Sequence, residues 1–431
     1  MDKMKRVRLG DVAIVELSGV DKKTKDSETT VQLCNYTDVY RNWAITRDMR
    51  PLFMVASAND NEINRFSLKR GQVALTKDSE TRDDIGIAAY IADDFDDVLL
   101  GYHCALITPN DSQVSGKYIN AYLHTSFVQK YFSDNASGSG QRYTLSVDVL
   151  NDIPLYLPSI EEQEEIGAIF SSIDKKISIN RQINDYLESM ARQLYDYWFV
   201  QFDFPDENGR PYKSSGGKMV WNEKLKREIP ANWRGSNICL LADILSGGTP
   251  SKVVSEYWNG SIPFFGPTDY KGGVFQLSTE EHITENGLTH CASSLFDIGT
   301  IMLTARGSIG KLVVVGTPMA MNQSCYALKS RRDEWEYLFF LTKQLIQHLL
   351  LKGGGSVFKS ITTVDIETSI LCIGEDNIIS HFTEVVRPLF QKIKNNSEEI
   401  ERMTREKEEL LPLLMNGQVS VRQLNNHLSH D

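Results

Sequence analysis

Two long stretches of the chain carry apolar residues at alternating steps of three and four positions, and each member of the second stripe lies 216 positions after its counterpart in the first. The first stripe comprises Ile166, Phe170, Ile173, Ile177, Asn180, Asn184, Leu187, Ala191, Leu194 and Trp198. The second comprises Phe382, Val386, Leu389, Ile393, Asn396, Ile400, Met403, Lys407, Leu410 and Leu414. A 3.5-residue period sustained this long is typical of a coiled-coil seam. Two ordinary amphipathic helices, each packed on its own domain, are the alternative.

Polar members of the stripes predict how the two helices pair. Asn180 and Asn396 lie at the midpoints of helices expected over residues 160–200 and 376–416. A buried Asn penalises wrong registers because it needs a polar group opposite. An antiparallel pair in matched register brings these midpoints face to face. It predicts a rod on the order of 60 Å long, at about 1.5 Å per residue.

The segments that precede the two helices resemble one another, which predicts an internal repeat. The matches pair Leu9-Gly10-Asp11 with Leu241-Ala242-Asp243, Thr37-Asp38 with Thr268-Asp269, Gly71, Thr76 and Ile85-Gly86 with Gly299, Thr304 and Ile309-Gly310, and Ala105-Leu106 with Ala327-Leu328. Short β-branched runs at 301–304 and 312–315 alternate with helical patterns at 116–132 and 334–351. Both segments are therefore expected to be mixed α/β domains.

The predicted fold is α/β, of mixed α+β type: two similar globular domains joined by two long helices that form an antiparallel coiled coil, with a pseudo-twofold internal repeat. Its predicted segments are a first domain over 1–158, a first coiled-coil helix over 159–201, a connector over 202–232, a second domain over 233–375, a second coiled-coil helix over 376–417 and a tail over 418–431.

Composition narrows the class of protein. A length of 431 residues suits two or three folded units. The formal net charge of −11 argues against a protein held on nucleic acid by bulk charge alone, although local basic clefts remain compatible with it. No apolar run is long enough for a membrane helix, and the polar start lacks a signal core, so a cytoplasmic protein is expected. Six cysteines without a C-x-x-C pair indicate reduced thiols.

Catalytic motifs are absent from the sequence. Gly307-Ser308-Ile309-Gly310-Lys311-Leu312 superficially resembles a phosphate loop, but it lacks the four residues between the glycines and the Ser/Thr after Lys. No G-x-S-x-G elbow, H-E-x-x-H helix, G-x-G-x-x-G after a strand or metal-ligand spacing of His is present. The Asn/Asp-Pro-Pro-aromatic motif of amino-methyltransferases is also missing. We therefore expect no catalytic residue, cofactor site or metal site in this chain.

Polar, basic and aromatic residues at similar loop positions of both domains are the candidate binding residues. Arg and Lys bind guanine edges or phosphates, Gln pairs with adenine, and Gly-rich loops allow close backbone approach. Taken singly, each is better explained as an ordinary surface residue, because surfaces are mostly polar, and it is the recurrence in both domains that supports the group. The candidates are Thr37, Asp38, Tyr40, Lys77, Arg82, Arg142 and Tyr143 in the first domain, and Thr268, Asp269, Tyr270, Lys271, Arg306, Lys311, Gln323, Ser356 and Phe358 in the second.

Two similar binding domains held apart by a rigid rod are suited to a split target, in which two short segments flank a stretch that is not read. Duplex DNA fits this description because the spacing of half-sites is set by helical pitch.

The centre of the chain carries the most specific sequence. Tyr195–Phe202, Gly216–Asn222 and Ile229–Trp233 closely resemble the central region of specificity subunits of type I restriction-modification systems. The duplicated layout resembles this family over nearly the whole chain. The resemblance implies two target-recognition domains that each read half of a bipartite, asymmetric site in double-stranded DNA. It also implies helices that dock two methyltransferase (M) subunits, together with restriction/translocase (R) subunits.

In such systems S-adenosylmethionine, ATP and Mg belong to the partner subunits, and the specificity subunit is not itself an enzyme. The resemblance therefore implies a role in DNA methylation and phage defence through the complex. One alternative is a scaffold of the same build that no longer reads a useful DNA site. A self-contained restriction enzyme is excluded, because no room remains in the 431 residues for nuclease and methyltransferase domains.

Overall fold

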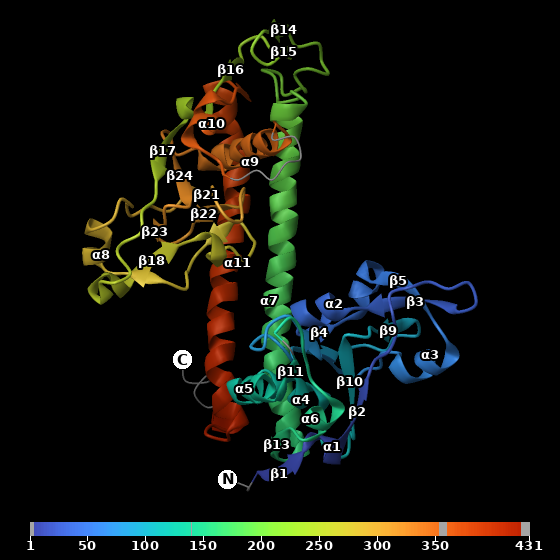
Figure 1. Cartoon of the computed structure of the whole chain (residues 1–431). Helices are drawn as coiled ribbons and strands as arrows, with labels where there is room; N and C mark the ends of the chain where they lie inside the picture. Colours follow the sequence, from blue (N-terminus) through green and yellow to red (C-terminus); the bar gives the residue numbers. More distant parts are fainter. Residues whose placement is uncertain (1–3, 139, 353–359, 424–431) are drawn as a thin grey trace. The chain divides into compact units, whose positions relative to one another are not determined.

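The computed structural model describes residues 4–138, 140–352 and 360–423. It divides into two compact units, unit 1 made of Met1–Ile177 with Arg402–Asp431 and unit 2 made of Ser178–Glu401. Each unit contains one globular domain and one part of each of the two long helices, which are green and red in Figure 1. The predicted fold of two mixed helix and sheet domains joined by two long helices is confirmed.

The N-terminal domain, in unit 1, is built on a five-stranded sheet in the order β2-β10-β6-β8-β4. Smaller sheets add β5-β3-β9, β11-β12-β7 and β1-β13. The strands are β1 (Lys5–Arg8), β2 (Ala13–Leu17), β3 (Thr29–Cys34), β4 (Ala44–Ile45), β5 (Met54–Ala58), β6 (Val73–Thr76), β7 (Asp78–Ser79), β8 (Ala88–Ile91), β9 (Val98–Leu100), β10 (Cys104–Pro109), β11 (Ser137–Gly138), β12 (Tyr143–Thr144) and β13 (Pro154–Leu157). The helices are α1 (Leu9–Val12), α2 (Tyr36–Arg41), η1 (Arg47–Leu52), α3 (Asp60–Phe66), α4 (Gly116–Leu123), α5 (Ser126–Asn135) and α6 (Val147–Asn151).

The C-terminal domain, in unit 2, repeats the five-stranded sheet in the order β17-β24-β21-β22-β19. Its strands are β16 (Arg234–Ser236), β17 (Ala242–Ser246), β18 (Trp258–Phe265), β19 (Phe275–Gln276), β20 (His282–Ile283), β21 (Ile301–Thr304), β22 (Leu312–Val315), β23 (Ala320–Met321), β24 (Cys325–Ser330) and β25 (Leu371–Ile373). Its helices are η3 (Ile238–Leu240), η4 (Ser255–Tyr257), η5 (Pro267–Asp269), α8 (Glu285–Thr289), α9 (Trp335–Lys352) and α10 (Thr363–Thr368).

The registers of the two sheets show how far the repeat extends. Cys104 faces Thr76 across β10 and β6, and Cys325 faces Thr304 across β24 and β21. In both sheets the last strand pairs in parallel with its neighbour, β4 with β8 and β19 with β22. The predicted internal repeat is therefore present at the level of individual hydrogen-bonded pairs.

Two of the sequence matches are shifted relative to the structural repeat. Ala105 faces Leu17 and its structural counterpart Tyr326 faces Ser246, so the match of Ala105 to Ala327 is one residue too far. The edge strands β2 and β17 start at Ala13 and Ala242, which makes the match of Leu9 to Leu241 three residues too far. Identity between small and apolar residues is common by chance, whereas strand register depends on every pair in the ladder.

The two long helices are α7 (Ile160–Tyr195, 36 residues) and α11 (Asp376–Met415, 40 residues). A π-helical turn, η2 (Asp196–Val200), continues α7. Ser159 caps α7, because its hydroxyl accepts a hydrogen bond from the Glu162 amide at 3.3 Å. All predicted stripe residues of both helices are buried or half-buried.

Contacts within each unit show that the helices run antiparallel. In unit 2, Asn396 Nδ2 donates to Asn184 Oδ1 at 2.9 Å and Asn180 Nδ2 donates to Glu399 Oε2 at 2.9 Å, so partner numbers fall as α7 numbers rise. In unit 1, Lys407 Nζ lies 3.7 Å from Asp174 Oδ1. The orientation was predicted, but the expected pairing of Asn180 with Asn396 is wrong. Asn396 bonds to Asn184, one helical turn farther along α7.

The predicted connector, 202–232, is a folded part of unit 2. It contains the hairpin of β14 (Met219–Asn222) and β15 (Arg227–Pro230). Phe204 stacks on Trp233 with ring centroids 5.1 Å apart, and Ile229 is fully buried in the same core. This packing ties the centre of the sequence to the ends of α7 and α11, since Phe199 and Phe382 belong to the same core.

Two further expectations concern the whole chain. All six cysteines are free thiols, and Cys34, Cys104, Cys325 and Cys372 are buried. Within the described residues, none of the helices has the length and apolar character needed to cross a membrane.

Candidate nucleic-acid interface

The matched Thr-Asp pairs lie at equivalent helix starts in the two domains. Asp38 Oδ2 accepts a hydrogen bond from the Asn35 amide at 2.8 Å at the start of α2. Asp269 Oδ2 accepts one from the Gly266 amide at 2.8 Å at the start of η5. Burial raises the pKa of Asp38. Both carboxylates are therefore occupied by their own backbone, while Thr37 and Thr268 are exposed beside them.

A second group of candidates in the N-terminal domain surrounds the connection from β6 to β8. Arg82 lies over the ring of Tyr143, with 5.3 Å between the guanidinium carbon and the ring centroid. Tyr40 donates a hydrogen bond to Asp84 Oδ2 at 2.8 Å, and this bond, with burial, raises the pKa of Tyr40 to about 12. These side chains form an aromatic and cationic surface beside α2.

A network that the sequence did not reveal lies next to this surface. His103 Nδ1 is 2.7 Å from Asp78 Oδ2, and Lys77 Nζ is 2.9 Å from the same oxygen. Arg142 Nη2 lies 2.9 Å from His103 Nδ1 and 3.1 Å from its Nε2. Burial acts to raise the pKa of Asp78, but hydrogen bonds from His103, Lys77 and Thr144 outweigh it and lower that pKa. Asp78 is therefore ionised at neutral pH.

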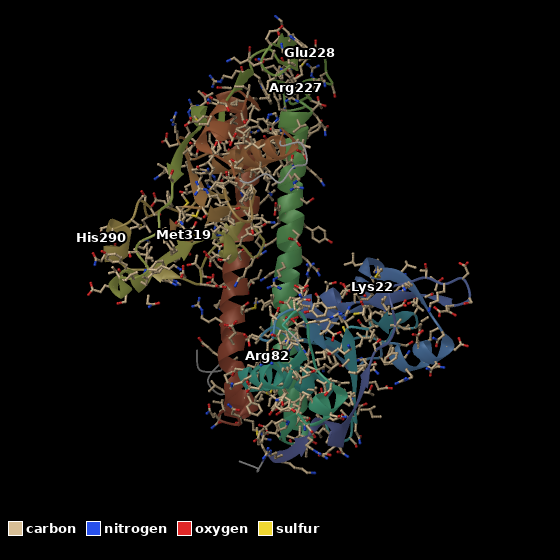
Figure 2. The ribbon with its side chains drawn as sticks, in the orientation of Figure 1. Lys22, Arg82, Arg227, Glu228, His290 and Met319 are labelled. Carbon is tan, nitrogen blue, oxygen red and sulfur yellow. The ribbon has the colours of Figure 1, made fainter. Side chains whose placement is uncertain are left out.

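The network borders a cavity of about 670 Å³ in the N-terminal domain, whose lining includes Lys22, Thr37, Asp78, Glu80, His103 and Arg142. Lys22 and Arg82 are labelled on this domain in Figure 2. Of the predicted residues, Thr37 and Arg142 line the cavity, whereas Tyr40, Lys77, Arg82 and Tyr143 do not. Asp78 and His103 were missed, although Asp78 directly follows a predicted residue.

In the C-terminal domain, Asp269 and Lys271 of the predicted residues line a cavity of about 500 Å³. Lys311 Nζ lies 5.3 Å from the centroid of the Tyr270 ring, and Lys271 pairs with Glu280 at 3.1 Å. Gln323 accepts a hydrogen bond from Thr249, and Arg306 is exposed. Ser356 and Phe358 lie outside the described residues.

The loop that resembles a phosphate loop is a turn between strands. It joins the antiparallel strands β21 and β22, and the Thr304 hydroxyl accepts from the Lys311 amide at 2.9 Å. A phosphate loop instead leads from a strand into a helix. Among the described residues, no cluster of three or more His, Cys, Asp or Glu is arranged to hold a metal ion.

The fold defines a duplicated recognition protein: one α/β domain occurs twice, each copy presents cationic and aromatic residues at matched loops, and paired helices connect the copies. The chain belongs to the family described as the type I restriction modification DNA specificity domain, whose model matches residues 1–189 and 230–401. The two matched segments correspond to the two copies of the repeat.

Individual relatives agree with this family. The chain is 27% identical over 323 residues to the type I restriction enzyme MjaIX specificity subunit of Methanocaldococcus jannaschii, covering 74% of this chain and 72% of the relative. It is 24% identical to the HindI specificity subunit of Haemophilus influenzae, covering 82% and 87%. A crystal structure of a type I restriction-modification S subunit from M. genitalium shares the fold, with a TM-score of 0.57, 12% identity and coverage of 96% and 97%.

Proposed function

We infer that this chain, as a member of the family, acts as a DNA-specificity subunit of a type I restriction-modification system. We propose that each domain reads one half of a bipartite, asymmetric site in double-stranded DNA and that the helix pair sets the unread spacer. The observation that carries this proposal is the duplicated sheet register, which gives both domains the same loops with different side chains. Equivalent loops with different residues are suited to reading two different short sequences.

The outer face of α7 supports docking of a partner subunit. Ile179, Tyr186 and Met190 of α7 are 44%, 71% and 52% exposed, and Tyr197 of η2 is 37% exposed. Steps of seven, four and seven residues place these side chains on one face of the helix. Exposed large apolar side chains on one face of a helix are typical of a protein interaction site. We propose that this face binds a methyltransferase subunit, with two such subunits and the restriction/translocase subunits completing the complex. S-adenosylmethionine, ATP and Mg would then be bound by these partners in the cytoplasm, where the target DNA is.

The test is single-molecule detection of methylated bases across the host genome, with and without the gene for this chain. We expect methyladenine at one two-part motif, and its loss on deletion. Restoring the intact gene should restore the motif, which controls for unrelated changes in the strain. An unchanged methylome would contradict the proposal and favour a scaffold that no longer selects DNA.

A second variant tests the docking surface separately. Tyr186→Ser with Met190→Ser replaces the most exposed apolar pair on α7 with polar side chains. We expect loss of co-purification with the methyltransferase and loss of methylation at the motif. The matched control is Glu384→Ser with Lys392→Ser on the exposed surface of α11, which should leave both unchanged.

A further inference from the structure

The repeat identifies which residues occupy the same place in the two recognition domains. The Lys77 amide donates to the His103 carbonyl at 2.9 Å, and the Ala305 amide donates to the Ser324 carbonyl at 2.8 Å. The carbonyls of the same two residues also accept matching bonds: the Leu145 amide donates to the Lys77 carbonyl at 2.8 Å and the Ile361 amide to the Ala305 carbonyl at 2.9 Å. Lys77 and Ala305 are therefore equivalent, and so are His103 and Ser324.

The residues at and beside these positions differ in charge. Asp78 follows Lys77 in the N-terminal domain, whereas Arg306 follows Ala305 in the C-terminal domain. Asp78 and His103 have side chains only 12% and 16% exposed and form a pair at 2.7 Å. Arg306 is exposed, and Ser324 at the place of His103 carries no charge. The same point of the fold thus offers a carboxylate-imidazole pair in one domain and a guanidinium in the other.

In the N-terminal domain the guanidinium comes from a different part of the chain, the loop before β12. Arg142 immediately precedes β12, which pairs with β7 through Thr144 and Asp78. Its Nη2 lies 2.9 Å from His103 Nδ1, the same ring nitrogen that lies 2.7 Å from Asp78 Oδ2, so the three side chains meet at one atom. Arg142 is otherwise exposed and borders the cavity, so its remaining N–H donors are available to a ligand.

We propose, building on the proposed function, that Arg142 reads a guanine edge in the half-site of the N-terminal domain, with His103 and Asp78 as positioning residues, and that Arg306 reads the other half-site directly. A planar guanidinium binds guanine O6 and N7 with two parallel hydrogen bonds. A side chain held by its neighbours loses less freedom when it forms them.

The charges around Arg142 favour a base over a phosphate as its ligand. The cavity is lined by three carboxylates, Asp78, Glu80 and Asp84, but by only one lysine, Lys22, and Asp78 is ionised. Carboxylates repel a phosphate, whereas a base edge carries no net charge. An arginine whose charge is partly balanced by a fixed carboxylate is therefore better suited to reading a base than to holding the backbone.

The experiment complements the deletion strain with variants of the full chain and sequences the methylated bases. Arg142→Ala should relax one G·C position of one half-site, and the ratio of methylation at that pair to the other three should fall by roughly 5- to 150-fold. Arg306→Ala should do the same at one position of the other half-site only. Arg142→Lys should also relax the position, because a lysine preserves a phosphate contact but cannot form the paired bonds.

Two comparisons test the positioning role: a double variant is compared with its single variants, and a conservative substitution is tested for partial recovery of the base preference. Asp78→Ala should relax the same base pair as Arg142→Ala, and the double variant should be no more relaxed than Arg142→Ala alone. Asp78→Glu should regain part of the preference, since it restores a carboxylate. A purely structural role predicts instead a lower level of methylation with every base preference intact, and that result would overturn the assignment.

Arg65→Ala is the matched control, because Arg65 is an exposed arginine of the same domain that does not line the cavity. Arg65, on α3, pairs with Glu16, on β2. It should leave the motif unchanged. A bipartite motif that stays intact in the Arg142 and Arg306 variants overturns the assignment while the proposed function stands. Absence of any bipartite motif with the intact chain overturns both.

Discussion

His124, in the N-terminal domain, links the stability of unit 1 to pH. Its Nδ1 lies 2.8 Å from the Asn120 carbonyl, and its ring is 4.4 Å from that of Trp43. Lys407 Nζ lies 3.5 Å from the centroid of the same tryptophan ring. Burial, reinforced by the charge of Lys407 and only partly opposed by the bond to Asn120, lowers the pKa of His124 from 6.5 to about 4.

We expect the free energy of unfolding of unit 1 to fall as pH is lowered from about 6.5 towards 4. In this window the unfolded chain binds a proton on this histidine and the folded chain does not, so the loss reaches roughly 3 kcal/mol. Urea unfolding at a series of pH values measures it. His124→Gln should flatten this part of the profile, and an equal slope in that variant would refute the assignment.

At the same scale, the sequence predicted positions better than roles. The equivalence of Thr37-Asp38 and Thr268-Asp269 is correct, because both Asp residues cap a helix start. Residue type alone does not show that both carboxylates accept hydrogen bonds from nearby backbone amides, because these bonds depend on the local geometry of the chain. His103 was not predicted because it lies 25 positions from Asp78 and becomes its partner only when β10 pairs with β6.

At the scale of elements, the hydrogen bond between Asn184 and Asn396 in the helix seam should make the effects of the two residues on the free energy of unfolding depend on each other. Asn396 is only 1% exposed and bonds to Asn184 at 2.9 Å. Asn184→Ala removes that partner and leaves the buried amide of Asn396 without this hydrogen bond. The free energy of unfolding of unit 2 should therefore fall by about 1–3 kcal/mol. Equilibrium denaturation of the variant and the intact chain gives this value.

The double variant Asn184→Leu with Asn396→Leu is the informative control. An apolar pair at a seam leaves no unsatisfied amide and should be as stable as the original or more so, at the cost of a less specific register. If the losses in free energy of unfolding of the two single variants add up in the double variant, the two residues act independently, and this would contradict an interaction through their hydrogen bond.

The sequence determined the seam but not its register. The three- and four-residue steps place every stripe residue on the buried face, because the helical period fixes which side chains align. Asn180 and Asn184 lie one turn apart on that face, so either is a suitable partner for Asn396. The choice follows from Glu399 and Ser397, which bond to Asn180 and Asn184 and lie outside the stripe.

At the scale of the whole molecule, net charge limits what the chain binds alone. With a formal charge of −11, long-range attraction to DNA is weak. We expect the isolated chain to bind its own site at least about 10-fold more weakly than the complex with methyltransferase at physiological salt. Fluorescence anisotropy with a labelled duplex measures both. Nanomolar, sequence-specific binding by the isolated chain would contradict this expectation.

The helix pair should set the spacer of the DNA site. Duplicating residues 178–184 in α7 and 396–402 in α11 adds one heptad to each helix at facing positions, since Asn184 bonds to Asn396. Seven residues lengthen a helix by about 10 Å, close to the rise of about three base pairs. The methylated motif should therefore keep both half-sites and gain about three unread base pairs.

Duplicating the heptad in α7 alone provides the control for this insertion. It displaces Asn184 from Asn396 and leaves the seam residues of α11 without their partners, so methylation should be lost together with stability. A matched insertion that changes the half-sites would show that the helices contribute to base reading. A matched insertion that leaves the spacer unchanged would show that the helix pair does not set the spacer, because a longer pair should increase the distance between the two half-sites.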